Sequence, residues 1–135
     1  MISATQSYFA GDWLMVRIIE NAPEGVIGEV WGEARFIEDG DGLACHETGV
    51  MRFQGEDFHI ERTSLWRFPE PGLVEVLYAD GRPFHHFLTE RPIALEFSGE
   101  ASYEIAYEFE PGTWISRWEI TEPGRRYLMT TRYRR

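Results

Sequence analysis

Residues Ser64–Phe87 read S-L-W-R-F-P-E-P-G-L-V-E-V-L-Y-A-D-G-R-P-F-H-H-F. Two runs of aromatic and branched residues are separated by the turn sequence P-E-P-G (69–72), and D-G-R-P (80–83) follows the second run. Proline presets a turn angle, aspartate starts a turn, and glycine supplies a positive φ. Runs joined by connections this short pair as antiparallel hairpins. The stretch therefore predicts two antiparallel strands and a tight turn into a third strand at 84–88.

The same pattern extends in both directions along the chain. Residues 26–37 alternate with a period of two, with small or apolar residues at even positions and Glu29, Glu33 and Arg35 at odd ones. Such alternation predicts a strand with one buried face, and small residues on that face suit a strongly curved sheet. Two further segments alternate in the same way. Their predicted shared faces hold Phe58, Ile60, Arg62, Ser64, Trp66 and Phe68 in one segment, and Tyr103, Ile105, Tyr107 and Phe109 in the other.

The order of these segments predicts the architecture. No segment shows a convincing helical stripe, although residues 1–10 suit a short helical turn, and N-A-P-E-G (21–25) predicts a turn between two early strands. Strands joined by hairpins form an antiparallel meander, and closing the meander into a barrel removes its exposed edges. We therefore expect an all-β, antiparallel up-and-down barrel of about eight or nine strands, in one domain over residues 1–135. A β-sandwich is the alternative, but sandwiches usually need longer crossover connections.

Composition limits the functions open to this chain. Its 135 residues carry a formal net charge of −10, which disfavours nucleic acid and anionic membrane surfaces as partners. All 13 basic residues are arginine, so there is no internal lysine for Schiff-base or pyridoxal-phosphate chemistry. The single cysteine, Cys45, excludes an internal disulfide and fits a reducing compartment. With no signal peptide and no membrane-spanning run, the sequence predicts a cytoplasmic protein.

Gly11-Asp12-Trp13 is similar to the G-x-W signature of lipocalins and of the wider calycin group. In those proteins the tryptophan closes the bottom of the barrel, and an arginine from the last strand packs across its ring. The resemblance implies that Trp13 is the closing residue here. It also implies that Arg132 or Arg134 is its partner, through a cation–π contact.

Longer stretches resemble an uncharacterised bacterial family of lipocalin-like domains, over nearly the whole chain. The resemblance implies a lipocalin-like (calycin) barrel and no established activity. In that family the strand before the penultimate one usually carries His, Cys and Asp ahead of a tyrosine; here Tyr107 matches, and the polar set is replaced. The stretches are G-D-W-L-M-V-R (11–17), G-L-A-C-H-E-T-G (42–49), L-W-R-F (65–68), D-G-R-P-F-H (80–85) and W-E-I-T-E-P-G-R-R-Y-L-M-T-T-R-Y-R-R (118–135).

Arginine and aromatic residues on the predicted strands are the candidate ligand contacts. An inward Arg62 would be a buried charge that needs either a glutamate partner or an anionic ligand. Its candidate partners are Glu47, Glu61 and Glu75. An arginine fork is the usual means of holding a carboxylate. The predicted ligand-binding residues are Arg62, Trp66, Arg67, Tyr78, Arg82, His85, Tyr103 and Tyr107.

His85, Glu47 and Tyr107 are the candidates for acid–base chemistry. His85 and His86 are adjacent, so on a strand only one of them faces the interior, and a bulge next to Pro83 leaves both choices open. Glu47 is more simply explained as a partner for an arginine. The sequence leaves open whether the protein is an enzyme.

No metal site is predicted, because the sequence has no H-x-H, H-E-x-x-H or C-x-x-C. No other cofactor is expected, although a single axial histidine leaves haem as an open alternative. Cys45 is more simply a small buried hydrophobic residue than a nucleophile.

Three functions of different classes fit this sequence. The first is an intracellular barrel that binds one small apolar or amphipathic anion between aromatic walls, with arginines for orientation. The second is an enzyme that performs acid–base chemistry on a small molecule in the same cavity. The third is a homodimeric or partner-docking module with a filled barrel, indicated by the basic segment Arg125–Arg135 on an acidic protein. The first is favoured because closed aromatic barrels generally hold a ligand, which is an argument from fold alone.

Overall fold

A computed structural model describes residues 4–21 and 24–135. Over those residues one short helix precedes ten strands. The helix is α1 (Gln6–Phe9), and the Thr5 hydroxyl caps it by accepting a hydrogen bond from the Tyr8 N–H. The strands are β1 (Gly11–Asn21), β2 (Gly25–Asp39), β3 (Gly42–Phe53), β4 (Glu56–Glu70), β5 (Leu73–Tyr78), β6 (Pro83–Leu88), β7 (Ile93–Ser98), β8 (Ala101–Glu110), β9 (Thr113–Glu122) and β10 (Arg125–Arg134).

The all-β antiparallel architecture and the short N-terminal helical turn are confirmed. The strand number is ten, so the prediction of eight or nine was too low. β5, β6 and β7 are the shortest of the ten strands, with six residues each. The predicted turn at 21–25 includes residues 22–23, which lie outside the described residues. In the described part of the chain no helix is long and apolar enough to cross a membrane.

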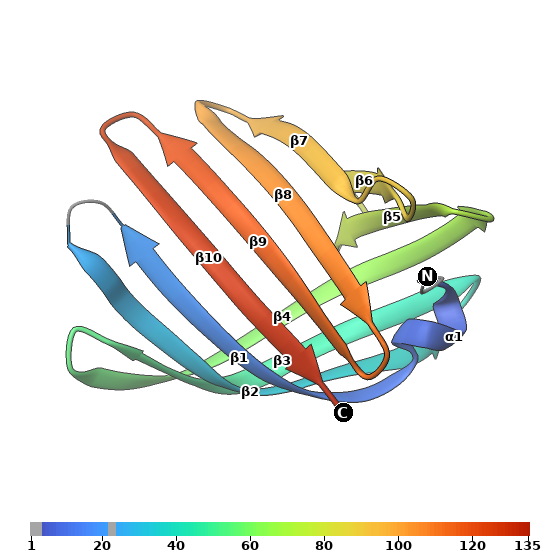
Figure 1. Ribbon diagram of the computed structural model, residues 1–135, viewed down its shortest axis with the longest axis horizontal. Helices are drawn as coiled ribbons and strands as arrows, with labels where there is room; N and C mark the ends of the chain where they lie inside the picture. The colour runs from blue at the N-terminus through green and yellow to red at the C-terminus, as the bar shows by residue number, and fades with distance from the viewer. Residues whose placement is uncertain (1–3, 22–23) are drawn as a thin grey trace.

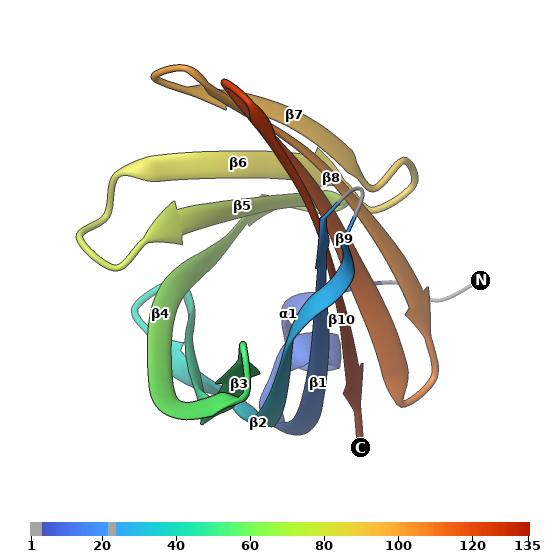
Figure 2. The ribbon, with the colours of Figure 1, turned by 90° about the vertical axis from the view of Figure 1, so that its left-hand side faces the viewer.

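All ten strands belong to one sheet, which curls into a nearly closed barrel (Figures 1 and 2). The strand order is β6-β5-β4-β3-β2-β1-β10-β9-β8-β7, and every neighbouring pair is antiparallel. β1 and β10 therefore lie side by side, as Figure 1 shows, although they are far apart in the sequence. The seam of the barrel lies between β6 and β7, next to an isolated bridge between Leu88 and Arg91.

A pair of glycines lets β2 and β3 approach closely along the curved wall. Gly32 lies directly opposite Gly49 in the β2–β3 register. A Cβ atom at Gly32 would lie 2.0 Å from the carbonyl oxygen of Thr48, and one at Gly49 would lie 2.3 Å from that of Trp31. No side chain fits at such distances, so both positions require glycine. At Gly32, the small residue predicted on the inward face of this strand is required by the close approach of β3.

Helix α1 fills one end of the barrel with the side chain of Phe9, which is completely buried. The ring centroids of Trp66, Trp114 and Phe36 lie 5.0, 5.4 and 5.7 Å from that of Phe9. Aromatic pairs at these separations stabilise beyond the burial of apolar area alone. Figure 1 shows α1 at one end of the barrel, and Figure 2 shows it within the outline of the strands. We call these four rings the aromatic plug.

Trp13 of β1 closes the same end of the barrel. Its buried indole donates a hydrogen bond from Nε1 to the carbonyl oxygen of Phe9 at 2.8 Å. The guanidinium carbon of Arg135 lies 3.9 Å from the centre of the indole ring, and Nη1 of Arg135 donates to the Ala10 carbonyl at 2.6 Å. A cation–π contact of the expected kind is therefore present on Trp13.

The predicted identity of the stacking arginine is corrected. Thr131 and Tyr133 occupy inward positions of β10 and are buried. Side chains alternate along a strand, so Arg132 and Arg134 point outward, and both are exposed. Arg135 follows Thr131 and Tyr133 in the same phase and reaches Trp13 instead.

Candidate functional site

Next to the aromatic plug the barrel interior holds a cavity of about 180 Å³. It is similar to the roughly 150 Å³ of an engineered apolar cavity that binds benzene. It is smaller than the roughly 300–1,000 Å³ of pockets for drug-sized ligands. Trp66 and Trp114 of the plug line this cavity and also contact Phe9, so they form the wall between the cavity and Phe9. Its other aromatic lining residues are Tyr78, Phe84, Tyr103, Tyr107, Trp118 and Tyr133.

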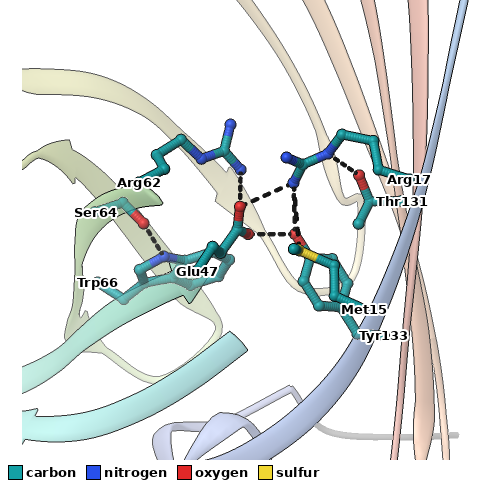
Figure 3. A network of polar contacts seen from close by, with 8 residues as sticks. All are labelled: Met15, Arg17, Glu47, Arg62, Ser64, Trp66, Thr131 and Tyr133. Carbon is teal, nitrogen blue, oxygen red and sulfur yellow. Dashed lines mark hydrogen bonds and ion pairs between the residues drawn. The ribbon is translucent and has the colours of Figure 1, made fainter. Parts of the chain in front are cut away.

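Glu47 of β3 is the centre of a buried polar network in this cavity (Figure 3). Its carboxylate is only 4% exposed. Oε1 lies 2.9 Å from Nη2 of Arg17 and 2.9 Å from Nη2 of Arg62. Oε2 accepts a hydrogen bond from the Tyr133 hydroxyl at 2.7 Å. This glutamate network (Glu47, Arg17, Arg62 and Tyr133) joins β3 to β1, β4 and β10.

Arg17 is held in this network by protein groups. Its side chain is buried, and its Nε donates to the Thr131 hydroxyl at 2.7 Å while Nη2 donates to Glu47. Figure 3 shows these bonds fixing the guanidinium between β10 and the carboxylate. Arg17 is therefore a fixed, buried counter-charge to Glu47.

Arg62 reaches the same carboxylate from β4 but faces the cavity. Its side chain is 38% exposed, and the residue lines the cavity wall. Its guanidinium carbon lies 5.0 Å from the centre of the Trp118 ring. Among the described residues, Glu47 is its one ion-pair partner, and no protein group bonds to its Nε or Nη1 atoms. Arg62 therefore keeps N–H donors for another group.

The network carries more positive than negative charge. Burial alone would raise the pKa of Glu47, but Arg62, Arg17 and the Tyr133 hydroxyl lower it to about 2. Burial also opposes the charge of Arg62, yet the carboxylate of Glu47 raises the pKa of Arg62 above its ordinary value. Arginine stays protonated in proteins. Two guanidinium groups thus face one carboxylate, and an anion in the cavity would balance the remaining charge.

His85 of β6 and Tyr107 of β8 form a second pair in the cavity wall. The His85 Nε2 lies 2.7 Å from the Tyr107 hydroxyl, and both side chains are buried. Burial, helped by the charges of His86 and Arg62, lowers the pKa of His85 to about 3. Burial likewise raises the pKa of Tyr107 above its ordinary value. Both groups are uncharged at neutral pH, so the pair is a polar but neutral part of the wall.

A β-bulge decides which histidine faces inward. The register between β5 and β6 shifts by one residue at Phe84, immediately after Pro83. Phe84 and His85 are consequently both buried, whereas His86 is exposed. The alternative that the sequence left open is resolved in favour of His85.

Most of the predicted ligand contacts lie together. Arg62, Trp66, Tyr78, His85, Tyr103 and Tyr107 all line the cavity, as does Glu47. Whether they bind a ligand stays a prediction. The expected alternative for Arg62 and Glu47, an ion pair between them, is present.

Two predicted contacts lie outside the cavity lining. Arg67 alternates with the inward Trp66, and its Nη2 pairs with Asp39 at 3.1 Å. Arg82 is exposed on the turn before β6, where its Nε pairs with Asp80 at 2.7 Å. Both arginines therefore have partners elsewhere on the protein.

Sequence reasoning did not single out Arg17, Tyr133 and Phe84. Arg17 has the same parity as the buried Trp13 and Met15, so the alternation in W-L-M-V-R contains the signal that it points inward. Phe84 gives no such signal, because a bulge interrupts the alternation there.

The geometry of the cavity bears on the metal and haem alternatives. In the described parts of the chain no three His, Cys, Asp or Glu side chains come together as metal ligands. His85 is the histidine of the cavity wall, and its Nε2 is already paired with Tyr107. A space of about 180 Å³ is also too small for a porphyrin, which is larger than a typical drug-sized ligand. Burial, with Glu47 nearby, raises the pKa of the Cys45 thiol, as expected of an inert buried cysteine.

Comparison with known proteins places this barrel among uncharacterised relatives. No curated protein matches the chain. Residues 9–135 match the family of unknown function DUF6314, so the match spans Trp13, all ten strands and every residue of the glutamate network. The chain therefore belongs to the family of unknown function DUF6314.

Proposed function

We propose that the protein binds one small apolar or amphipathic organic anion inside its barrel, at the guanidinium of Arg62. The observation that carries this proposal is the shared carboxylate: Arg17 already neutralises Glu47, and Arg62 is a second arginine on the same group. Arg62 also presents free N–H donors to the cavity. A ligand carboxylate would accept hydrogen bonds from these N–H groups in the bidentate geometry that guanidinium favours.

The cavity wall suits the rest of such a ligand. Aromatic side chains surround the space, and they supply apolar contact area while the arginine supplies orientation. The neutral His85–Tyr107 pair adds no charge that would compete with Arg62 for the anion. The ligand is therefore an anion with a small apolar body.

The test is a thermal-shift screen with small carboxylates, followed by titration calorimetry of those that raise the melting temperature. A ligand that binds only the folded state stabilises it. We expect Arg62→Gln to weaken binding at least tenfold, because it removes a charge-assisted hydrogen bond. Arg67→Gln is the matched control, since Arg67 lies on the same strand outside the cavity. No shift with any acid, or an equal loss in both variants, would overturn the proposal.

We also propose that the family is related to the lipocalins and calycins, and that this member is bacterial and cytoplasmic. The Arg135–Trp13 contact at the closed end of the barrel supports the relationship. The single cysteine, which is buried and unpaired, supports a reducing compartment. The net charge of −10 supports a small-molecule partner over nucleic acid or an anionic membrane. Homodimer formation stays a prediction.

An acid–base enzyme is the second candidate function, because His85 and Tyr107 are within hydrogen-bond distance in one cavity. Both are neutral near pH 7, which ranks this candidate below binding. Nitrogen NMR of the His85 side chain in the ligand-bound protein tests it. Titration of His85 between pH 6 and 8 would support acid–base chemistry, and a histidine that stays neutral over that range would argue against it.

A further inference from the structure

We propose that the anion is a single-ring aromatic carboxylate, not a fatty acid or another aliphatic acid. This inference rests on the proposed function, since it names the class of ligand that Arg62 would hold. Three properties of the cavity carry it: its volume, the arrangement of rings around it and the position of its charged group.

The volume limits the ligand to about one ring. The cavity measures about 180 Å³, close to the roughly 150 Å³ that holds one benzene molecule. At its inner end Trp66 and Trp114 pack against Phe9 and prevent the space from extending further along the barrel. A long alkyl chain therefore cannot extend past these rings into the barrel.

The rings around the cavity suit an aromatic guest better than an aliphatic one of the same size. Phe84 lies at the centre of this wall, with its ring centroid 5.0 Å from Tyr78, 5.3 Å from Trp118 and 5.4 Å from Tyr103. Phe84 and Tyr103 meet edge to face. Another flat ring can join this arrangement through edge-to-face or offset contacts, and a saturated ring gains no such contacts.

The charged group lies beside these rings and not at a distance from them. The guanidinium carbon of Arg62 is 5.0 Å from the Trp118 ring, and Trp118 in turn contacts Phe84. A carboxylate attached directly to a ring would place its charge at Arg62 while the ring stays among the aromatic side chains. A carboxylate at the end of a long flexible chain would lose more conformational entropy on binding to the same place.

The experiment is titration calorimetry with four matched probes: benzoate, cyclohexanecarboxylate, dodecanoate and benzamide. We expect benzoate to bind roughly two- to tenfold more tightly than cyclohexanecarboxylate. Burial of apolar area alone would not favour benzoate, because the saturated ring is of similar size and no less apolar. We expect no binding of dodecanoate, and at least tenfold weaker binding of the uncharged benzamide.

A pair of variants separates ring recognition from charge recognition. Phe84→Leu removes the central ring and should bring the benzoate and cyclohexanecarboxylate affinities together. Arg62→Gln should weaken both acids equally and preserve their ratio. Phe68→Leu is the control, because Phe68 contacts Phe9 and lies outside the cavity lining. Circular dichroism and the melting temperature verify that each variant is folded.

The outcomes distinguish the two proposals. If none of the acids binds, or if benzamide binds as tightly as benzoate, the proposed anion site itself fails. If cyclohexanecarboxylate binds as tightly as benzoate, or if dodecanoate binds, the anion site stands and the aromatic class is overturned. If Phe84→Leu keeps the preference for benzoate over cyclohexanecarboxylate, the aromatic wall is not the cause of that preference.

Discussion

Arg135 places its guanidinium over the indole of Trp13, with 3.9 Å between the guanidinium carbon and the ring centre. The same side chain donates hydrogen bonds to the carbonyl oxygens of Ala10 and Tyr8. One residue that follows β10 thus holds both the closing tryptophan of β1 and the segment that leads from α1 into that strand.

Arg135→Gln should therefore destabilise the protein. A cation–π contact contributes about 0.5–2 kcal/mol, and the hydrogen bonds to two carbonyls add to it. We expect a loss of about 1–3 kcal/mol in the free energy of unfolding, measured by urea denaturation. Arg134→Gln is the control, because Arg134 is exposed and should change stability by less than about 0.5 kcal/mol. Equal effects in the two variants would contradict the closing role of Arg135.

Glu47→Gln should lower the free energy of unfolding more than Arg135→Gln does. It removes the negative charge between Arg17 and Arg62 and leaves two guanidinium groups without a counter-charge. Breaking a buried ion pair from one side costs about 3–5 kcal/mol. Adding Arg62→Met to this variant should recover part of the loss, since it removes one of the unpaired charges. Urea denaturation of the single and double variants measures both effects, and a double variant less stable than Glu47→Gln would contradict this account.

Acid should destabilise the protein through His85. The folded-state pKa is about 3, against an ordinary value of 6.5, so unfolding takes up a proton between these two values. The contribution of neutral His85 is complete above pH 6.5 and is lost as the pH falls towards 3. We expect a slope of about 1.4 kcal/mol per pH unit below pH 6.5. Denaturation from pH 7 to 5 should show this slope, and His85→Gln should remove it; a slope retained in the variant would assign it to another group.

Glu47 should contribute to the same acid sensitivity at lower pH. Its folded-state pKa is about 2 and its ordinary value 4.5. The stability that its ionised form provides is complete above pH 4.5 and is lost as the pH falls towards 2. A carboxyl-stretch infrared titration should find more ionised carboxylate at pH 3 in the wild-type protein than in Glu47→Gln. Identical carboxylate signals at pH 3 in the two proteins would show that the two arginines do not hold the charge.

Gly32→Ala should disrupt the curved wall between β2 and β3. The new Cβ would lie 2.0 Å from the Thr48 carbonyl oxygen, so the strands would have to separate. We expect a loss of about 2–4 kcal/mol in the free energy of unfolding. Gly28→Ala is the matched control on the same strand, because its Cβ would come no closer than 3.3 Å to any neighbour. If Gly28→Ala were as unstable as Gly32→Ala, the loss would come from replacing a strand glycine in general and not from the close approach of β2 and β3.

The period-two pattern predicted the fold and several residues that line the cavity, because the pattern depends on local geometry. Arg62 and Trp66 share parity on β4, and both line the cavity as expected. The same rule places Arg67 outside the cavity, although Arg67 was predicted to be a ligand contact. Alternation therefore predicted the cavity wall better than residue chemistry did.

Other features depend on contacts that no local pattern contains. The bulge at Phe84 turns two consecutive side chains inward, and the pairing of Glu47 with Arg17 joins residues of different hairpins. On β7 the alternation is misleading: apolar residues are expected to face inward, but Ile93, Leu95 and Phe97 are 62%, 56% and 69% exposed. This strand lies at the seam of the barrel, where it has a partner strand on one side only.

The wall formed by Trp66 and Trp114 separates the packed, closed end of the barrel from the cavity. On one side these rings pack against Phe9, and on the other they border the cavity. Phe84 and Tyr103 line the cavity and are not among the ring contacts of Phe9, so a change in the cavity lining need not alter how this end of the barrel is closed. The shape of the cavity can therefore change in evolution while the closed end is kept.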